Sequence, residues 1–509
     1  MTDGSIAGRR GGGPDALVMG VDLGTGGARA VIADAAGDIL ATSHADLEAV
    51  AAATPPERQG WHEQDPEAWW RAAKRAIRDA LRQTGGTAEV AAHLRAICVD
   101  GTSGTVVGID LDGNPATPAL MYNDARAAEE ARQLDGLARQ HAGAGTAPVS
   151  AAPGIAKMLW IERHLPDAFA ATHIFAHQAD FIAGRLIGRF GTTDYSNALK
   201  SGFDLTTDAW AGWIDQHPGV RARLPRVVAP GDELGQVSER VAAALGLPPG
   251  MAVIAGVTDG TAAFLASGAR CAGDDNTTLG TTLVFKRLVD RHVEDPAGLL
   301  YCHKLPGASW LPGAASNVGG EWIRTDFPGA DLRRLDRLAS ELLPTQQLCY
   351  PLRTQGERFP FKSPEATGFC EPEVAEPAPR YAACLQGTAL VERLGYAVLD
   401  GATRRRDSIT PGAVHATGGG SRSDVWMQLR ADVCGRTYHR PSCHESAFGS
   451  AILAAASTIH QNLGEASQAM VTIARTFHPD RTRHQMYDEI YQRFLRLLEQ
   501  RGFLTRSLP

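Results

Sequence analysis

The 509-residue chain is predicted to be an α/β protein of two domains. Strands and helices alternate along the first half, and a strand–Gly/Thr turn–strand unit opens each half. The chain is also longer than one hydrophobic core usually fills. We expect a disordered tail at 1–15, an N-terminal domain at 16–268 and a C-terminal domain at 269–505.

The first strand–turn–strand unit is the most informative segment. The apolar run Ala16–Val21 predicts a strand that ends at Asp22, and a second strand is expected at Ala28–Asp34. Glycines in such a turn let backbone N–H groups approach a phosphate, and the carboxylate can hold Mg²⁺. The alternative for Asp22 is a side chain that only caps the turn. The turn residues expected beside a phosphate are Gly24, Thr25 and Gly26.

The remainder of the first half continues the alternation. Asp65 followed by Pro66 is typical of a helix start, so a helix is expected from there to Gln83. Further strands are expected at 38–43, 94–99 and 105–110, and further helices at 153–165 and 178–186.

The second half repeats the opening pattern. The continuous apolar run Met251–Val257 predicts a buried strand, with Asp259 just before a helix at Thr261–Ala269. A second strand–turn–strand unit follows at Thr277–Lys286, this time without an acid. Later elements are a helix at 382–400, a strand at 415–417, a Gly-rich turn at 418–420, a helix from 424 and an amphipathic helix at 485–501.

The composition argues against a nucleic-acid-binding protein and against a membrane-spanning one. The net charge of −7 gives no electrostatic reason to bind nucleic acid, and no apolar run is long enough to span a membrane. The eight cysteines form no C-x-x-C pair and the histidines show no metal-ligand spacing, so a reducing cytoplasm is expected. A homodimer is a candidate assembly.

The order of the motifs resembles that of one known family. An N-terminal D-x-G-T-x-G turn, G-W-x-E-Q-D-P before a helix, an apolar strand ending in Asp-Gly, L-G-T-T and a late G-G-G turn run from about Leu17 to about Arg501. Together they resemble the FGGY carbohydrate kinases. The resemblance implies two ribonuclease-H-like domains of the actin/hexokinase ATPase type around a central cleft. ATP and Mg²⁺ would bind between the domains, with a small sugar or polyol beside them.

The branch of the family is indicated by the loop after the strand at 94–99. Its D-G-T-S-G-T sequence, Asp100–Thr105, looks like that of the D-ribulose kinase branch, which is xylulokinase-like. Asn123–Arg126 is instead closer to the N-D-x-R of xylulokinases. D-Ribulose is therefore the expected substrate, D-xylulose is the alternative, and a non-catalytic ATP-binding regulator is a more distant one.

The resemblance assigns the chemistry to a few carboxylates. Asp259 is expected to accept the proton of the sugar hydroxyl; the alternative is a helix N-cap. Asp22 and Asp259 are both expected at the Mg²⁺ and the sugar, facing each other across the gap between domains. Ser103 is the expected sugar contact, and Asp100 would orient its loop. Trp61 and Glu63 would line the sugar side, although Trp61 could equally be a core residue.

The nucleotide is expected to be held by three Gly-rich turns. Gly280 and Thr281 would face the first turn across the phosphates. Gly419, Gly420, Ser423 and Asn317 would surround the adenosine. The alternative is that these are ordinary turns. Lys286 and Arg29 are candidate cations but are expected to be solvated charges at strand ends.

Overall fold

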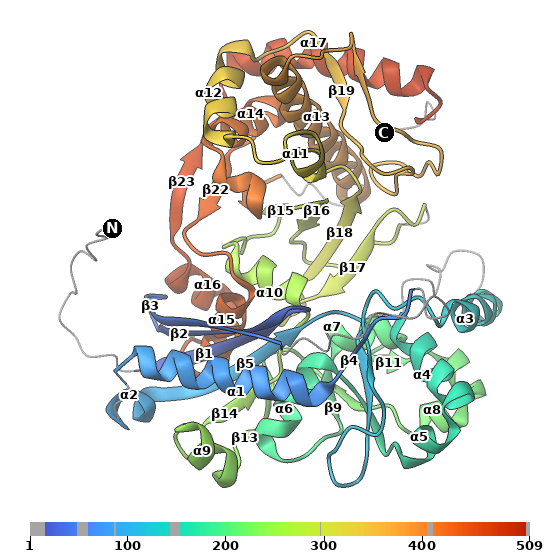
Figure 1. The fold of residues 1–509 in the computed structure, drawn as a ribbon, viewed down its shortest axis with the longest axis vertical. Coiled ribbons are helices and arrows are strands. Elements are labelled where there is room, and N and C mark those ends of the chain that lie inside the picture. The colour runs from blue at the N-terminus through green and yellow to red at the C-terminus, as the bar shows by residue number, and fades with distance from the viewer. Residues whose placement is uncertain are drawn as a thin grey trace.

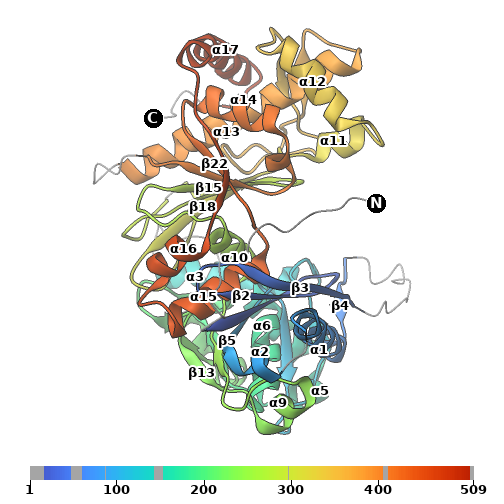
Figure 2. The same cartoon turned by 90° about the vertical axis from the view of Figure 1, so that its left-hand side faces the viewer.

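The computed structural model describes residues 16–47, 60–85, 88–142, 153–295, 297–404 and 411–504. The predicted tail at 1–15 lies outside them. The described elements form two lobes, one above the other in Figure 1 and turned in Figure 2. The lower lobe is built on a six-stranded sheet, in the order β13 (Glu233–Gln236), β14 (Ala252–Ile254), β5 (Leu94–Gly101), β1 (Leu17–Leu23), β2 (Gly27–Asp34) and β3 (Ile39–Asp46).

The upper lobe is built on a seven-stranded sheet of related design. Its order is β17 (Tyr301–Lys304), β18 (Trp310–Ser316), β16 (Leu283–Arg287), β15 (Asp275–Leu279), β21 (Val414–Thr417), β22 (Tyr438–Pro441) and β23 (Ile473–Phe477). In the lower sheet β1 pairs antiparallel with β2 and parallel with β5. In the upper sheet β15 pairs antiparallel with β16 and parallel with β21. Each predicted strand–turn–strand unit is thus a hairpin at the centre of a mixed sheet.

Helices cover both faces of the lower sheet, so all seven residues of β1 are buried. One face carries α1 (Pro66–Gln83), α6 (Gln178–Ile187) and α9 (Glu239–Leu245). The other carries α10 (Asp259–Ala266), α15 (Ser446–Thr458) and α16 (Leu463–Met470). This double coverage explains why β1 reads as a continuous apolar run rather than an alternating one.

The helices α15 and α16 come from the far end of the chain. In Figure 1 they are the red helices beside the blue strands of the lower lobe. A Cβ on Gly20 of β1 would lie 1.8 Å from the carbonyl oxygen of Ala447, and one on Gly449 would lie 1.9 Å from that of Ala262. The small residues therefore let α15 lie directly on β1 and α10. The boundary predicted at 268/269 stays a prediction, but these two helices complete the lower lobe.

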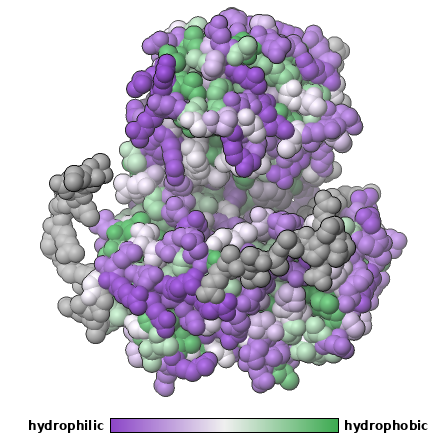
Figure 3. All heavy atoms as spheres, in the orientation of Figure 1, coloured by the Kyte–Doolittle hydropathy of each residue, from purple (hydrophilic) through white to green (hydrophobic). Residues whose placement is uncertain are grey.

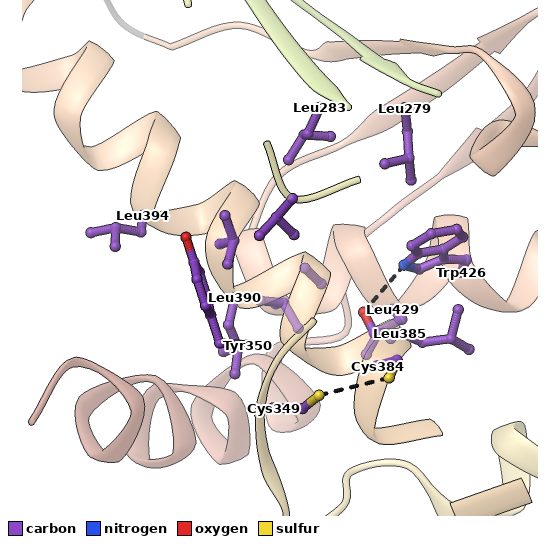
Figure 4. Close-up of a cluster of buried hydrophobic side chains, with 14 of the residues drawn as sticks. Leu279, Leu283, Cys349, Tyr350, Cys384, Leu385, Leu390, Leu394, Trp426 and Leu429 are labelled. Atoms are coloured by element: carbon purple, nitrogen blue, oxygen red, sulfur yellow. Dashed lines mark hydrogen bonds between the residues drawn. The ribbon is translucent and has the colours of Figure 1, made fainter. Parts of the chain in front are cut away.

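The upper lobe has its own core under the β15–β16 hairpin. Its helices are α11 (Glu321–Asp326), α12 (Leu332–Leu342), α13 (Pro377–Arg404), α14 (Asp424–Cys434) and α17 (Arg481–Gln500). Figure 4 shows Leu279 and Leu283, at the tip of the hairpin, directed toward Trp426 and Leu385 from α14 and α13. The predicted amphipathic helix at 485–501 corresponds to α17 from its second turn to its C-terminal end, and Tyr487 and Phe494 are buried.

Smaller elements complete the two lobes. The lower lobe adds a sheet of β4 (Glu63–Gln64), β7 (Ala119–Leu120), β6 (Val106–Ile109) and β8 (Ile174–His177). It also has α2 (Ala88–His93), α3 (Ala128–Ala142), α4 (Pro153–His164), α5 (Pro166–Ala171), α7 (Tyr195–Ala198) and α8 (Pro218–Arg221). The two-stranded sheets are β9 (Thr192–Asp194) with β12 (Arg226–Val228), β10 (Phe203–Asp204) with β11 (Ala209–Trp210), and β19 (Leu348–Tyr350) with β20 (Phe369–Glu371).

Candidate active site

Three aspartates meet at one edge of the lower sheet. Asp22 and Asp100 are register partners on the neighbouring parallel strands β1 and β5. Gly101 then bridges to Thr258, the residue before Asp259, so the third chain segment ends at the same edge. Asp22 and Asp259 therefore lie on the same lobe and face the gap together. The expectation that they face each other across the gap is wrong, because β1 and the segment before α10 both belong to the lower sheet; the domain predicted at 16–268 does contain both residues.

Asp100 is the most buried of the three. Its side chain has no exposed surface, and its Oδ2 accepts a 2.6 Å hydrogen bond from Ser450 Oγ of α15. Its Oδ1 is buried and has no hydrogen-bond donor among the described residues. Burial, followed by the negative charge of Asp22, raises the pKa of Asp100 well above its ordinary value.

Asp259 is the first residue of α10. Thr258, not Asp259, is the N-cap, and Asp259 instead accepts a 2.6 Å hydrogen bond from its neighbour's N–H at Gly260. The side chain is half-buried, and Lys286 of the upper lobe lies near enough to interact with it electrostatically. This burial raises the pKa of Asp259 to about 6, with Asp22 contributing in the same direction and Gly260 and Lys286 opposing it. A carboxylate of that pKa is a better proton acceptor than an ordinary one.

Lys286 reaches the aspartates from the upper lobe. It lies on β16, is 6% exposed, and its Nζ donates a hydrogen bond to the carbonyl oxygen of Gly260 in the first turn of α10. Burial lowers the pKa of Lys286 to about 8, although Asp259 opposes this. The prediction of a solvated strand-end charge is therefore wrong for Lys286. The reason is that the lower lobe covers this part of β16.

Arg29 behaves differently from Lys286. Its side chain is 48% exposed, and Nη1 donates to Asp22 Oδ2 over 3.1 Å. The two residues are register partners on β1 and β2. Arg29 thus remains close to solvent, as expected, but it is also the cation beside Asp22.

The carboxylates at this edge suit Mg²⁺ only with help from a substrate. No group of three or more His, Cys, Asp and Glu side chains in the described part of the chain is arranged to hold a metal ion. Mg²⁺, however, is usually held by one or two carboxylates with waters and phosphate oxygens. Asp22 and Asp259 supply that number of carboxylates beside the gap. The donor set therefore fits a magnesium–nucleotide complex better than a metal bound by protein alone.

The predicted phosphate turns present open backbone. A Cβ added at Gly26 or Gly280 would meet no atom within 4 Å, and one at Gly24 would come no closer than 3.8 Å to any. Their lack of a side chain is therefore not explained by packing inside the protein. The carbonyl oxygen of Thr25 accepts a 2.8 Å hydrogen bond from Gln64 of the W-x-E-Q segment, which ties this segment to the first turn.

The other nucleotide candidates gather around the tip of β15. Gly418 has φ +82°, and a Cβ there would lie 2.6 Å from the carbonyl oxygen of Leu279. A Cβ on Gly420 would collide with the Leu279 side chain, whereas one on Gly419 would meet open space. The Gly-rich turn thus packs directly on the second hairpin, beside Gly280 and Thr281.

Asn317 and Ser423 are held by local hydrogen bonds. The N–H of Asn317 donates to Glu357 over 2.7 Å, and its Nδ2 donates to the carbonyl oxygen of Gly356. The loop continues to Gly320, whose N–H donates to the carbonyl oxygen of Gly280 over 2.7 Å. Ser423 caps α14 by accepting from Trp426 N–H. Its hydroxyl is therefore partly engaged in holding the helix.

The sugar side is defined by the loop after Asp100. Ser103 Oγ is buried and has no partner within the described ranges. The loop itself is held firmly, since Lys157 Nζ donates to the carbonyl oxygen of Gly104 over 2.8 Å and Thr102 donates to Gln178. A buried hydroxyl without a partner is the kind of group that a ligand or a water molecule can satisfy.

Trp61 and Glu63 enclose an arginine next to this region. The guanidinium of Arg126 lies 3.9 Å from the ring centroid of Trp61 and is hydrogen bonded to Asp124 and Glu63. Trp61 is half-buried and packs edge-on against Trp160. Trp61 is thus partly a packing residue, and its place at the sugar stays a prediction. The N-D-A-R segment fixes the arginine rather than leaving it free in solvent.

Sequence reasoning missed Ser450 and underrated Lys286. Ser450 is more than 300 residues from Asp100 in the chain. The one available signal was the run of small residues around Ser450, which indicates close packing of a helix. Nothing in the sequence identified β1 and α10 as the surfaces it packs on.

Comparison with known proteins agrees with this geometry. The sequence models of the N-terminal and C-terminal domains of the FGGY family of carbohydrate kinases match residues 17–266 and 251–458. The xylulose kinase of Streptomyces coelicolor is 31% identical, over 86% of this chain and 87% of that protein. The xylulose kinase of Escherichia coli K12 is 27% identical, over 95% and 99%. The crystal structure of xylulose kinase from Rhodospirillum rubrum has a TM-score of 0.79 at 26% identity, covering 95% of this chain and 98% of that one.

These findings confirm the fold class and the enzyme class. The two α/β lobes have the architecture of sugar kinases of the actin/hexokinase ATPase type. Across the described ranges, no helix is both long and apolar enough to cross a bilayer. Figure 3 shows the surface recessed between the two lobes. The hydrogen bond from Lys286 to Gly260 joins the upper lobe to the lower one. The relatives cited are named xylulose kinases, which supports an ATP-dependent sugar kinase without identifying the sugar. The chain belongs to the FGGY family of carbohydrate kinases.

Proposed function

We propose that this enzyme transfers the terminal phosphoryl group of ATP to a ketopentose, with D-ribulose as substrate and D-ribulose 5-phosphate as product. The observation that carries the proposal is the meeting of Asp22, Asp100 and Asp259 at one sheet edge, opposite Lys286 of the other lobe. Carboxylates that face a cation across a gap suit a reaction in which a hydroxyl must lose a proton beside a polyphosphate.

In this proposal Asp259 accepts the proton of the attacking hydroxyl. With a pKa of about 6 it is ionised at neutral pH, yet it is basic enough to take up a proton as the transfer proceeds. Its place at the rigid start of α10 fixes the acceptor oxygen. Lys286 is the cation nearest this acceptor from the upper lobe, and it holds Gly260 in position.

Asp22 would hold the hydroxyl and, with Asp259, the metal. Bound Mg²⁺ would neutralise charge on the phosphates. Asp100 is the register partner of Asp22 on β5, and burial followed by the charge of Asp22 raises its pKa. Ser103 would contact the sugar, since its buried hydroxyl lacks a partner in the described part of the chain.

The Gly-rich turns would hold the nucleotide. We propose that Gly24, Thr25 and Gly26 face the phosphates from the lower lobe and that Gly280 and Thr281 face them from the upper lobe. Asn317, Gly419, Gly420 and Ser423 would surround the adenosine. The open space above Gly26, Gly280 and Gly419 supports this arrangement. The segments 16–268 and 269–505 would then be a sugar domain and an ATP domain, working in the cytoplasm.

D-Xylulose is the second candidate substrate. The relatives named xylulose kinase favour it, as does the N-D-A-R segment with its fixed Arg126. The D-G-T-S-G-T loop at Asp100–Thr105 favours D-ribulose, because it resembles the corresponding loop of the D-ribulose kinase branch. The two sugars differ at one hydroxyl, so a single hydrogen bond can decide between them.

A panel of ketoses tests the proposal. The purified enzyme is supplied with ATP and Mg²⁺, and release of ADP is measured with each sugar and without sugar. Turnover that is highest in kcat/KM with D-ribulose supports the proposal, whereas preference for D-xylulose supports the second candidate. Nucleotide binding without turnover on any ketose would contradict both and would favour a regulator. The Asp259→Asn variant serves as the background for contaminating kinases.

A further inference from the structure

Three cysteine side chains converge inside the upper lobe. Cys349 and Cys370 lie directly opposite each other on the antiparallel strands β19 and β20. Cys384, on α13, places its Sγ 3.7 Å from the Sγ of Cys349, as Figure 4 shows. All three are free thiols. The proposed chemistry of phosphoryl transfer uses none of them.

The three thiols differ in access and in acidity. Cys349 and Cys384 are buried, whereas Cys370 is partly exposed. A hydrogen bond with Cys349, helped by the positive charges of Arg380 and Arg353, lowers the pKa of Cys370. The same hydrogen bond and a second one with Cys384 raise the pKa of Cys349. The partly exposed thiol is therefore the more nucleophilic one, and a second thiol lies against it.

We propose that Cys370 and Cys349 are a peroxide-sensitive pair that forms a reversible disulfide across β19 and β20. Directly opposed residues of an antiparallel pair have Cα atoms about 4.5–5.5 Å apart, within the span that a disulfide bridges. The backbone positions of the two cysteines therefore permit the bridge.

The reaction takes place in two steps. The Cys370 thiolate attacks one oxygen of hydrogen peroxide, so that the O–O bond breaks, hydroxide leaves and Cys370 becomes a sulfenic acid. The Cys349 sulfur then attacks the Cys370 sulfur, giving the disulfide and releasing water that carries the sulfenic oxygen and the thiol proton. The peroxide takes up the two electrons that the thiols lose. An added dithiol returns them and restores both cysteines.

The disulfide would act on the loops around the nucleotide. The hydroxyl of Tyr350, the residue after Cys349, donates a 2.7 Å hydrogen bond to Glu357 Oε2. Glu357 Oε1 in turn accepts the N–H of Asn317. A change in β19 therefore reaches the loop that packs on Gly280 through two hydrogen bonds. Loss of one of them is expected to raise KM for ATP about fivefold. This effect depends on the proposed function, whereas formation of the disulfide does not.

Peptide mapping of the full-length enzyme tests the pair directly. The protein is treated with hydrogen peroxide, alkylated and digested without reductant. We expect one linked peptide that joins Cys349 to Cys370 and disappears after a dithiol is added. A Cys349–Cys384 link, or oxidation confined to the exposed Cys271, would overturn the proposal.

Matched variants separate the disulfide from general damage. Cys370→Ser should abolish both the link and the rise in KM for ATP, whereas the control Cys271→Ser should keep both. Cys349→Ser should leave Cys370 as a sulfenic acid that a dimedone probe labels. If Cys370→Ser loses activity to peroxide as fast as the unaltered enzyme, the pair is not responsible. If the link forms but KM for ATP does not change, the connection to the nucleotide loops is wrong.

Discussion

The two central hairpins of the molecule have one design and opposite uses of charge. The β1–β2 hairpin carries its ion pair near the turn, where Asp22 and the half-exposed Arg29 face the gap. The β15–β16 hairpin has leucines near its turn and its ion pair at the far end, where Arg287 and Asp275 are fully buried. The first hairpin thus offers charge to a ligand. The second hairpin is anchored by its buried ion pair, and Lys286 is its one charged side chain directed toward the site.

The difference shows how a repeated unit can divide its tasks. In the lower sheet, helices cover both faces, so the hairpin can leave its turn free for chemistry. In the upper sheet, Arg287 is joined to Asp275 by two 2.8 Å hydrogen bonds and also contacts Asp400 and Thr403. Four experiments test whether the two hairpins differ in this way.

The largest expected effect is the loss of kcat when Asp259, the proposed proton acceptor on the lower lobe, is replaced. Asp259→Asn keeps the shape of the side chain but cannot take up a proton, so kcat should fall by about 10² or more. KM for ATP should stay nearly constant, because the proposal leaves most nucleotide contacts to the upper lobe. Steady-state ADP release gives both values. Asp208→Asn, at an exposed aspartate paired with Lys304, is the control and should be unchanged. Normal kcat in Asp259→Asn would end the assignment.

The second expected effect is on stability. Arg287→Met leaves the buried carboxylate of Asp275 with Arg436 as its remaining cation, and should lower the free energy of unfolding by about 3 kcal/mol. Arg29→Met, the corresponding change in the first hairpin, removes a half-exposed guanidinium from the buried Asp22 and should cost about 1 kcal/mol, because water screens this arginine. Denaturant titration of both variants measures the contrast. Equal losses would mean that the two ion pairs do not differ in role.

A smaller effect is expected at the cation between the lobes. Lys286→Met removes the hydrogen bond to Gly260 and the charge beside Asp259, and should lower kcat about tenfold. Lys304→Met, in the same sheet but paired with the exposed Asp208, is the matched control. Initial rates at saturating ATP and sugar give the comparison. Identical rates for the two variants would show that neither the charge nor the hydrogen bond of Lys286 contributes to kcat.

The smallest expected effect is on the pH dependence of kcat/KM. Asp259 must be ionised to accept a proton, so kcat/KM should rise with pH through about 6 and level off above it. Lys286 must be charged, so a second limb should fall above about 8. Lys286→Arg keeps its charge at every accessible pH and should remove only the upper limb. A lower limb that persists in Asp259→Asn would assign it to another group.

Much of the fold and part of the site could be predicted from the sequence. The hairpins and the helix after Asp65 were predictable because turns, caps and apolar runs are local. The proximity of Asp22 and Asp259 followed from motif order, and the domain predicted at 16–268 contains both residues. Lys286 was misjudged because a strand residue's burial depends on what packs over it. Ser450 could not be found, because its contact with Asp100 joins distant segments.

The position of α15 has a consequence for how this chain is made. The apolar face formed by Val18, Val31 and Ala96 is closed by residues 447–470, which are synthesised more than 300 residues after β5. The lower lobe must therefore wait for α15 and α16 before its interior is sealed. A fragment that stops before residue 446 would expose that face and should aggregate, so the amino-terminal half is not an independent folding unit.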